Sequence, residues 1–328
     1  IGHVAEIGGM VPGAFCGEAT EIFHEGLRVP PVKIKKAGHD VDEVWKLLLA
    51  NTRTPRQNYG DLRAMIGSVD LGVARISQIV EKYGRAVFKS TCEDLMDYAE
   101  RRMRAELASF PDGRYAFHDV IENDGIEAKP YTVAIDLHIN GDELVADYDR
   151  SSPQARGPVN ATLGVATGAV YNGILHVTDP SIPKNSGCFR PIRVVAPPGK
   201  VVKVDYPGPL VAGNTETHPR LANITIGAMS QCVPERAMAS ESCTGTNFVF
   251  GGEHPDYGPD STRTFVRNCV YSVHGKARCP LEPGEYEVFF SHGPEFNRVQ
   301  KTITVAKGET RSLNVELERV VDTSGWVS

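Results

Sequence analysis

Apolar residues recur with two different periods along the chain, and the change of period divides it. Between about residues 40 and 110 they recur every three or four positions, which predicts helices. One such face consists of six apolar residues, in chain order Leu62, Ile66, Val69, Val73, Ile76 and Val80. From residue 116 the apolar positions alternate, which predicts strands over residues 116–122, 131–139 and 143–148.

Local end signals predict where the helices begin and end. Asp40 opens a capping box and is the predicted N-cap of a first helix. A second helix is expected from near Asp61 to Tyr83, with Gly84 as its C-cap. A third helix is predicted to begin at Ser90 or Thr91, because either hydroxyl can cap it.

The strand region contains a turn and a later helix. Asn140-Gly141 lies between the second and third predicted strands and is typical of a hairpin turn. Small residues predict a further helix over residues 164–176. Loops rich in Pro, Gly and Asn follow this helix, and loops on a rigid scaffold often carry functional residues.

Composition excludes several classes of function. The net charge is −6 and the pI is about 6.0, and without a basic cluster this argues against nucleic-acid binding. No apolar run approaches the roughly 20 residues of a membrane span, and no signal peptide is visible. The seven cysteines are scattered without a C-x-x-C pair, which favours reduced thiols in the cytoplasm over a disulfide framework. A length of 328 residues predicts two domains.

The first 34 residues concentrate the side chains that can do chemistry. They hold two histidines and four carboxylates among several glycines: His3, Glu6, Glu18, Glu21, His24 and Glu25. Metal ligation and acid–base catalysis need such groups to be brought together by backbone that turns sharply, which glycine permits. The alternative interpretation is a solvent-exposed terminal loop without chemistry. Because the chain opens without an initiator Met, we expect it to be a fragment.

Other candidate groups lie farther along the chain. Arg190 and Arg220, both in or beside loops, are suited to bidentate binding of a carboxylate or phosphate. Cys188 is either a catalytic thiol or, as is more common, a buried structural cysteine. Acidic residues gather at strand ends, where they either bind a cation or form turns: Glu122, Asp124, Asp136, Asp147 and Asp149.

Several short motifs follow one another along the chain. They are His3-Val-Ala-Glu-Ile-Gly-Gly, Thr20-Glu-Ile-Phe-His-Glu-Gly, Asn51-Thr-Arg, Gly60-Asp-Leu-Arg-Ala, Glu122-Asn-Asp-Gly, Gly157-Pro-Val-Asn, Asn185-Ser-Gly-Cys-Phe-Arg-Pro and Asn214-Thr-Glu-Thr-x-x-Arg. Together they resemble the hydantoinase B/oxoprolinase family over about residues 1–255. The resemblance is specific because so many separate motifs occur in the family's order.

The resemblance implies a B-type subunit of an ATP-dependent hydantoinase or 5-oxoprolinase-like enzyme. A hydantoinase A-like partner would use ATP to activate the substrate carbonyl, and the B-type subunit would complete the hydrolysis of a cyclic amide. The complex would be a hetero-oligomer with neither nucleic acid nor membrane as a partner. Two alternatives stay open. One is a subunit of an acetone or acetophenone carboxylase-like complex acting on a ketone, and the other is a catalytically incompetent fusion remnant serving as a binding or scaffold protein.

The resemblance also implies site residues. In the carboxylase branch of the family, a motif H-x-x-D-[IV]-G-G supplies metal ligands. His3 and Glu6 match it with Glu in place of Asp, and His24 is a further candidate ligand. The metal would be Mn, Fe or Zn. Glu25 would act as acid or base, and Arg190 or Arg220 would hold an activated, anionic substrate.

Residues 259–328 follow a different pattern. A turn at Leu281-Glu-Pro-Gly precedes alternating segments that predict strands up to residue 291 and over residues 300–305 and 311–317. This small β-sandwich pattern is similar to carboxypeptidase-regulatory-like modules, and it resembles the domain that precedes the catalytic part of CehA/McbA-type metallohydrolases. The expected fold is therefore α+β: a hydantoinase B-like mixed α/β core over residues 1–258 and a β-sandwich module over residues 259–328.

Overall fold

The computed structural model describes residues 2–4, 6–239, 281, 283–290, 297 and 299–318. The chain forms two compact units, residues 1–263 and residues 264–328. The larger unit combines helices with a four-stranded sheet, which agrees with the expected α+β class. The predicted domain boundary between residues 258 and 259 lies outside the described residues.

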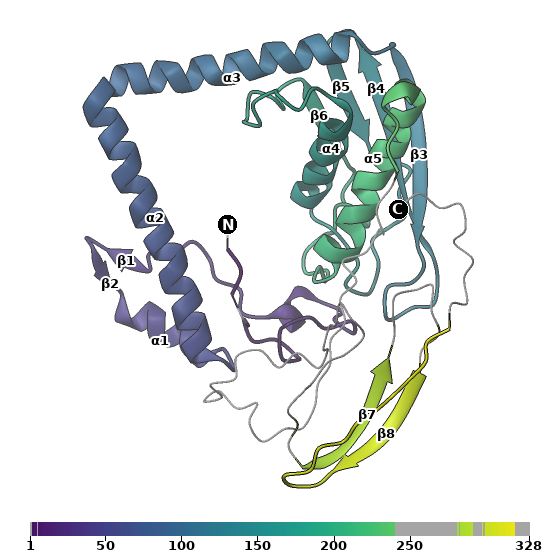
Figure 1. Cartoon of the computed structure of the whole chain (residues 1–328). Helices are drawn as coiled ribbons and strands as arrows, with labels where there is room; N and C mark the ends of the chain where they lie inside the picture. Colours follow the sequence, from purple (N-terminus) through teal and green to yellow (C-terminus); the bar gives the residue numbers. More distant parts are fainter. Residues whose placement is uncertain are drawn as a thin grey trace. The chain divides into compact units, whose positions relative to one another are not determined.

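Three helices follow an N-terminal segment in the larger unit (Figure 1). The segment contains the short 3-10 helix η1 (Ile22–Glu25) and a ribbon of two short strands, β1 (Lys35–Lys36) and β2 (His39–Asp40). The helices are α1 (Asp42–Ala50), α2 (Pro55–Tyr83) and α3 (Arg85–Ala108).

The predicted capping role of Asp40 is wrong. The N-cap of α1 is Val41, which forms no side-chain cap. The Asp40 carboxylate instead accepts hydrogen bonds from the Arg63 guanidinium of α2. A charged hydrogen bond across elements therefore replaces the local cap that the sequence suggests. The second helix also begins earlier than predicted, at Pro55, because proline suits the first helical turn.

Gly84 separates α2 from α3, as predicted for a C-cap. Its backbone φ is +84°, which favours glycine, and its N–H donates to the Val80 carbonyl at 2.8 Å. The predicted start of the third helix at Ser90 or Thr91 is wrong, because α3 begins at the residue after Gly84. A single left-handed residue thus both ends one helix and redirects the chain into the next.

The sheet of the larger unit has the strand order β3-β4-β5-β6. Its strands are β3 (Gly113–Ile121), β4 (Tyr131–Asn140), β5 (Glu143–Asp147) and β6 (Ile192–Val195). The first three are antiparallel neighbours, and β6 pairs parallel to β5. The predicted hairpin is confirmed, since Asn140 pairs with Glu143 across the turn.

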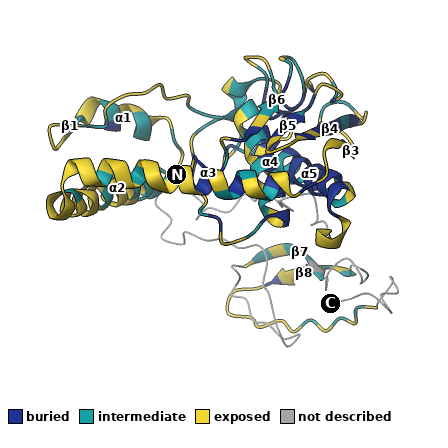
Figure 2. Ribbon diagram, turned by 90° about the horizontal axis from the view of Figure 1, so that it is seen from above, coloured by how far each residue is buried: buried dark blue, intermediate teal, exposed yellow. Residues whose placement is uncertain are grey.

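The core of this unit lies between the sheet and two helices (Figure 2). Helix α4 (Leu163–Val177) confirms the predicted small-residue helix, and α5 (His218–Cys232) packs against α4, β3 and β4. The largest fully buried side chains include Tyr148, Met103, Leu107, Ile135, Leu137, Ile174, Leu221 and Met229. Apolar burial of this extent supplies most of the driving force for folding.

Helix α2 presents much of its predicted apolar face to solvent. Val69, Val73 and Ile76 are 65%, 62% and 50% exposed, and Figure 2 shows most of α2 as exposed. The period of the stripe is helical, as predicted, but the described residues of the unit leave these side chains uncovered. Helical periodicity therefore identifies the helix and not its packing partner.

The smaller unit contains the hairpin of β7 (Gly284–Phe290) and β8 (Val299–Val305). The strands are antiparallel, with Gly284 opposite Val305, which confirms two of the predicted strands. Residues 311–317 do not form the third predicted strand, although exposed and half-buried positions alternate from residue 313 to 318.

The short 3-10 helix η3 (Pro234–Arg236) follows α5 in the larger unit.

We expect the outward side chains of α2 to contribute little to stability. Ile76→Ala should change the free energy of unfolding by no more than about 0.5 kcal/mol, because the side chain is largely exposed. Leu107→Ala should lower it by about 2–5 kcal/mol, because Leu107 is fully buried. Urea unfolding followed by circular dichroism measures both. A similar loss in the two variants would mean that the face of α2 is covered in solution.

Candidate functional site

Loops from distant parts of the larger unit meet at a pocket of about 230 Å³. Its lining consists of Gly17, Ile121, Glu122, Asn123, Asp124, Gly125, Pro158, Val159, Ala212, Glu216 and Arg220. Three of the motifs noted in the sequence contribute to it: Glu122-Asn-Asp-Gly after β3, Gly157-Pro-Val-Asn before α4, and Asn214-Thr-Glu-Thr-x-x-Arg at the start of α5. The pocket is thus the place where the tertiary structure gathers these motifs.

Asp124 organises the first of these loops. Its side chain is 1% exposed, and Oδ1 accepts the backbone N–H groups of Ile126 and Glu127 at 2.9 and 2.6 Å. Oδ2 accepts the Tyr131 hydroxyl and the Gly157 N–H, both at 2.8 Å. Burial raises the pKa of Asp124, but these hydrogen bonds outweigh it and hold the pKa below its ordinary value.

Gly157 allows the first and second loops to approach closely. A Cβ at this position would overlap the backbone carbonyl of Asp124. Only glycine leaves room for the N–H of residue 157 to reach the Asp124 carboxylate.

Asn160 connects the second loop to the third. Its side chain is fully buried, and Nδ2 donates to the carbonyls of Ala155, Gly157 and Pro209 at 3.0 to 3.1 Å. Its Oδ1 accepts the N–H of Ala155 at 2.7 Å. One amide therefore satisfies four backbone groups that would otherwise be buried without partners.

The third loop ends in a single π-helical turn, η2 (Gly213–Thr217), which runs directly into α5. The buried Thr217 hydroxyl donates to the Val159 carbonyl and so ties this turn to the second loop. Isolated π turns are frequent at functional sites. This turn carries Glu216 to the pocket, and the first turn of α5 carries Arg220.

Arg220 joins α5 to the end of β3. Its guanidinium lies 3.2 Å from the Asp119 carboxylate and 2.8 Å from the Glu122 carboxylate, and the side chain is 16% exposed. The sequence prediction that Arg220 belongs to a site agrees with its place in the pocket lining. Two carboxylates already compensate its charge, which weakens its attraction for an anionic substrate.

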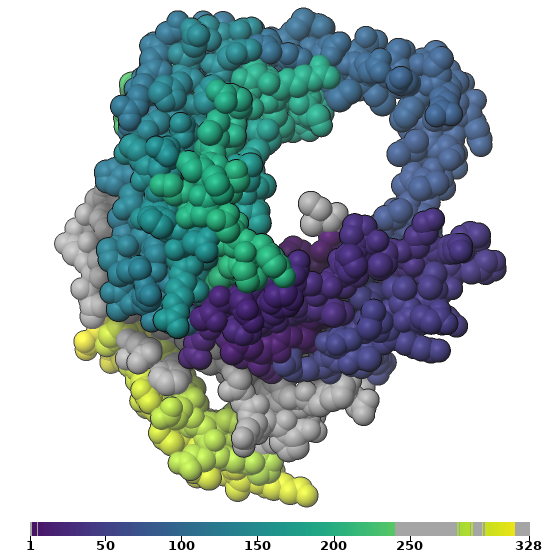
Figure 3. Space-filling view, turned by 180° about the vertical axis from the view of Figure 1, so that it is seen from behind, coloured from purple at the N-terminus to yellow at the C-terminus, as the bar shows by residue number. Residues whose placement is uncertain are grey.

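Glu25 supports the pocket from the N-terminal segment. Its Oε1 accepts the backbone N–H groups of Leu210 and Val211, the latter at 2.8 Å. Burial raises the pKa of Glu25, and the two backbone hydrogen bonds oppose this rise. Figure 3 shows the N-terminal segment against the segment that precedes α5. Glu25 therefore holds the backbone beside Ala212, and the acid or base role expected of it stays a prediction.

Glu6 lies in a separate cluster with Arg53. The Glu6 side chain is 4% exposed, and its Oε1 lies 2.5 Å from the Arg53 guanidinium. Its Oε2 accepts the backbone N–H of Arg53 at 2.8 Å. The guanidinium also donates to the Gly9 carbonyl at 2.7 Å, so this ion pair fastens the N-terminal segment to the residues before α2.

The residues present do not fit the predicted metal centre. Both Glu6 oxygens accept hydrogen bonds from Arg53, His3 is exposed, and His24 Nδ1 accepts the Thr20 N–H at 3.2 Å. Within the described ranges, no three side chains of His, Cys, Asp or Glu lie close enough together to hold a metal. The ligand roles of His3, Glu6 and His24 stay a prediction, and no step below runs through a metal.

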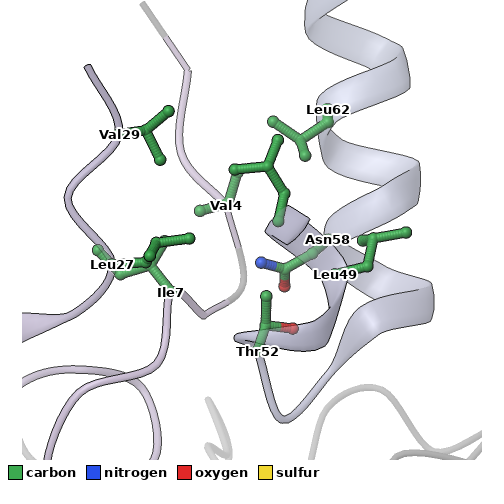
Figure 4. A pocket seen from close by; sticks show the side chains of 9 residues that line it. Val4, Ile7, Leu27, Val29, Leu49, Thr52, Asn58 and Leu62 are labelled. Atoms are coloured by element: carbon green, nitrogen blue, oxygen red, sulfur yellow. The ribbon is translucent and has the colours of Figure 1, made fainter. Parts of the chain in front are cut away.

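A second, smaller pocket of about 130 Å³ lies beside this cluster (Figure 4). Its lining is mainly aliphatic: Val4, Ile7, Leu27, Val29, Leu48, Leu49, Thr52, Asn58 and Leu62. The buried Asn58 amide donates to the Glu6 backbone carbonyl and is therefore engaged in holding the segment. This pocket is a junction between the N-terminal segment and helices α1 and α2, with no charged side chain in the lining that the structure describes.

The remaining candidates have structural surroundings. Arg190 lies 2.7 Å from Asp97 and 2.9 Å from Glu100 of α3, and it is not among the residues that line the larger pocket. Its expected role in substrate binding stays a prediction. Cys188 is fully buried, and burial raises the pKa of its thiol, which favours the structural interpretation.

The acidic residues predicted to lie at strand ends form ion pairs and turns, although Asp136 lies inside β4. Asp136 accepts hydrogen bonds from Arg114 and Arg150, and Asp147 accepts the Asp149 N–H at 2.9 Å. Sequence reasoning noted Asp124 only as one of these acids and did not single out Asn160 or Glu216. Asp124, Asn160 and Glu216 all belong to the motifs quoted above. Those motifs were therefore the signal in the sequence that could have identified these residues.

None of the helices in the described part of the chain combines the length and hydropathy that crossing a membrane requires. The expected cytoplasmic location stays a prediction.

A family model described as Hydantoinase B/oxoprolinase matches residues 1–281. The chain belongs to this family. The predicted resemblance over residues 1–255 is thereby confirmed, and the match continues past the predicted end of the first domain at residue 258. The likeness of the C-terminal residues to CehA/McbA-type proteins stays a prediction.

Two relatives illustrate the family. The caprolactamase subunit beta of Pseudomonas jessenii is 32% identical over 276 residues, which are 84% of this chain and 47% of that protein. A 5-oxoprolinase of Dictyostelium discoideum is 26% identical over 259 residues, 78% of this chain and 20% of that protein. The chain spans less than half the length of these curated relatives.

Two solved structures share the fold. The crystal structure of the ATP-dependent caprolactamase from Pseudomonas jessenii matches with a TM-score of 0.68 and 32% identity, over 71% of this chain and 40% of that one. A nucleotide-free acetone carboxylase structure matches with a TM-score of 0.65 and 15% identity, over 71% and 32% of the two chains. The first match supports the expected hydantoinase B-like core, and the second shows a shared fold alone.

We expect Asp124 to make the stability of the larger unit depend on acid pH. Its hydrogen bonds stabilise the folded state above its ordinary pKa of 3.8, and this contribution is lost as the pH falls through the lowered folded-state pKa. Asp124→Asn should therefore be less stable than the wild type at pH 7 and lose less stability below about pH 4. Urea unfolding across this pH range measures the difference.

Asp94→Asn is the matched control for this measurement, because Asp94 is exposed on α3. It should keep the pH dependence of the wild type. An unchanged pH dependence in Asp124→Asn would contradict the role assigned to the Asp124 carboxylate.

Removing the Arg53 guanidinium should leave the nearly buried Glu6 carboxylate without its main partner. We expect Arg53→Met to lower the free energy of unfolding by about 1–3 kcal/mol. The double variant Glu6→Gln/Arg53→Met should recover part of this loss, and urea unfolding completes the double-mutant cycle. Bound metal is measured in parallel by mass spectrometry. About one equivalent of metal that is lost in Glu6→Gln would contradict the ion-pair assignment and favour the predicted metal centre.

Proposed function

We propose that the chain is the B-type subunit of an ATP-dependent enzyme that hydrolyses a cyclic amide. The observation that carries this proposal is the convergence of three family motifs on one pocket, which is lined by the carboxylates of Glu122 and Glu216 and by the guanidinium of Arg220. The names of the relatives support the substrate class, because caprolactamase and 5-oxoprolinase are both named for cyclic amides. The word subunit in the first name supports a multi-subunit complex.

The proposed division of labour follows from chemistry. An amide carbonyl is a poor electrophile, so an A-type partner would use ATP to phosphorylate the carbonyl oxygen. The B-type subunit would then hold the activated ring while water attacks the carbonyl carbon. A pocket with fixed donors and acceptors suits this task, since it orients the reactants at little cost in reorganisation. Arg220 would face the phosphorylated oxygen from the wall of the pocket.

Two alternatives are less well supported. A carboxylase acting on a ketone rests on the acetone carboxylase match, whose 15% identity bears on the fold alone. A binding or scaffold protein without activity has no specific observation in its favour, because the pocket is built by buried, fully bonded side chains. We also propose that a non-catalytic β-module lies within the predicted range of residues 259–328, which the β7–β8 hairpin supports.

Reconstitution tests the proposed function. The chain is co-expressed with an A-type subunit, and caprolactam, 5-oxoproline and hydantoin are supplied with ATP. We expect ring opening, measured as new amine or carboxylate, together with ADP formation. Asn160→Ala should reduce the rate at least about 100-fold, because the second and third loops lose one of the hydrogen bonds that connect them and a misplacement near 1 Å has an effect of this size. Glu81→Gln, on the exposed part of α2, should match the wild type.

Other outcomes have distinct meanings. Bicarbonate-dependent consumption of acetone or acetophenone without ring opening would favour the carboxylase. Neither reaction, in a complex that still assembles, would favour the scaffold.

A further inference from the structure

Glu216 differs from the other titratable side chains of the larger pocket. Glu122 pairs with Arg220, and Asp124 accepts hydrogen bonds on both oxygens. Among the residues of this lining, which all belong to the described part of the chain, Glu216 is the titratable side chain without a hydrogen bond or ion pair. Its carboxylate is therefore available to a ligand.

The backbone that carries Glu216 is held in place on both sides. Its own N–H donates to the Ala212 carbonyl at 2.8 Å. The following residue, Thr217, is buried and bonded to Val159, and the residues before the turn are held by Glu25. A side chain on a fixed turn can be positioned against a substrate without reorganisation of the loop.

The other groups of the lining are poorly suited to exchange a proton. The Arg220 guanidinium has hydrogen-bond donors and no acceptor, so it can bind negative charge and cannot act as a base. Glu122 is mostly exposed and is paired with Arg220. Asp124 uses its oxygens for four donors that hold the loop, so protonating it would cost those hydrogen bonds.

We propose that Glu216 is the general base of ring opening, an inference that rests on the proposed function. The carboxylate takes a proton from water while the water oxygen bonds to the activated carbonyl carbon. The carbon–nitrogen bond then breaks, its electron pair goes to nitrogen, and nitrogen takes the proton from Glu216. At the same time the new hydroxyl oxygen forms the carbonyl and releases its remaining proton to solvent. The product of this step is an open-chain acyl phosphate with a free amine. A second water releases inorganic phosphate, so one ATP and two waters are used for each ring opened.

The test uses the chain assembled with its A-type subunit and a cyclic amide that the wild type opens. Glu216→Gln should lower kcat by about 10²- to 10⁴-fold, the usual contribution of a general base, with little change in KM. The fall of kcat on acidification, which protonation of the base causes, should disappear in this variant. Glu216→Ala should regain activity when formate or azide is added, because a small base can enter the space left by the side chain. Glu81→Gln is the control and should match the wild type.

The outcomes separate the two proposals. Wild-type activity with an equally active Glu216→Gln variant and an unchanged pH profile overturns the role of Glu216 alone. A lower rate that neither formate nor azide restores, with the acidic fall of kcat retained, also overturns it, because it assigns Glu216 a structural role. If the wild-type complex assembles and opens no cyclic amide, both proposals are overturned.

Discussion

The larger pocket depends on two buried side chains, Asp124 and Asn160, that hold backbone from distant parts of the chain. Loops at a pocket cannot bond to one another as strands do, yet their buried N–H and C=O groups need partners. A carboxylate and an amide supply several such partners from one position, which offsets the cost of burying these polar groups. Together with the Thr217–Val159 hydrogen bond they fix the separation of the three motif loops, and with it the place of Glu216 at the pocket.

A second constraint concerns three arginines whose guanidiniums join distant elements of this unit and are balanced by carboxylates. Arg53 pairs with Glu6, Arg190 with Asp97 and Glu100, and Arg220 with Asp119 and Glu122. Each pair joins two elements that are far apart in the sequence, so these arginines act first as connections. At the pocket this balance leaves the Glu216 carboxylate without a cationic partner among the described residues, which suits proton transfer from water.

The N-terminal segment takes part in both constraints. Glu6 fastens it to the residues before α2, and Glu25 fastens it to the loop before the π turn. Among the histidines and carboxylates of this segment, Glu6 and Glu25 therefore hold backbone in place. The second pocket is a product of this arrangement, since aliphatic side chains of the segment meet those of α1 and α2 (Figure 4). The segment thus braces the pocket and adds Gly17 to its lining, while the loops around the sheet supply the charged side chains of the lining.

The sequence by itself determined helices α1 to α4, most of the strands, the hairpin between β4 and β5 and the family, because period, turn residues and motif order are local properties. It did not predict α5 (His218–Cys232). It misplaced the starts of α1, α2 and α3. An ion pair from Asp40 to Arg63 replaces the cap expected for α1, Pro55 begins α2 earlier than expected, and α3 follows directly after Gly84 with its positive φ. It named Arg220 but not Glu216, although both stand in one motif. Only the tertiary structure decided which pocket carboxylates form ion pairs or hydrogen bonds, as Glu122 and Asp124 do, and that Glu216 does not within the described part of the chain. Hydrogen-bond partners such as Gly157 and Asp124 are far apart in the sequence, so a local sequence pattern cannot show that they meet.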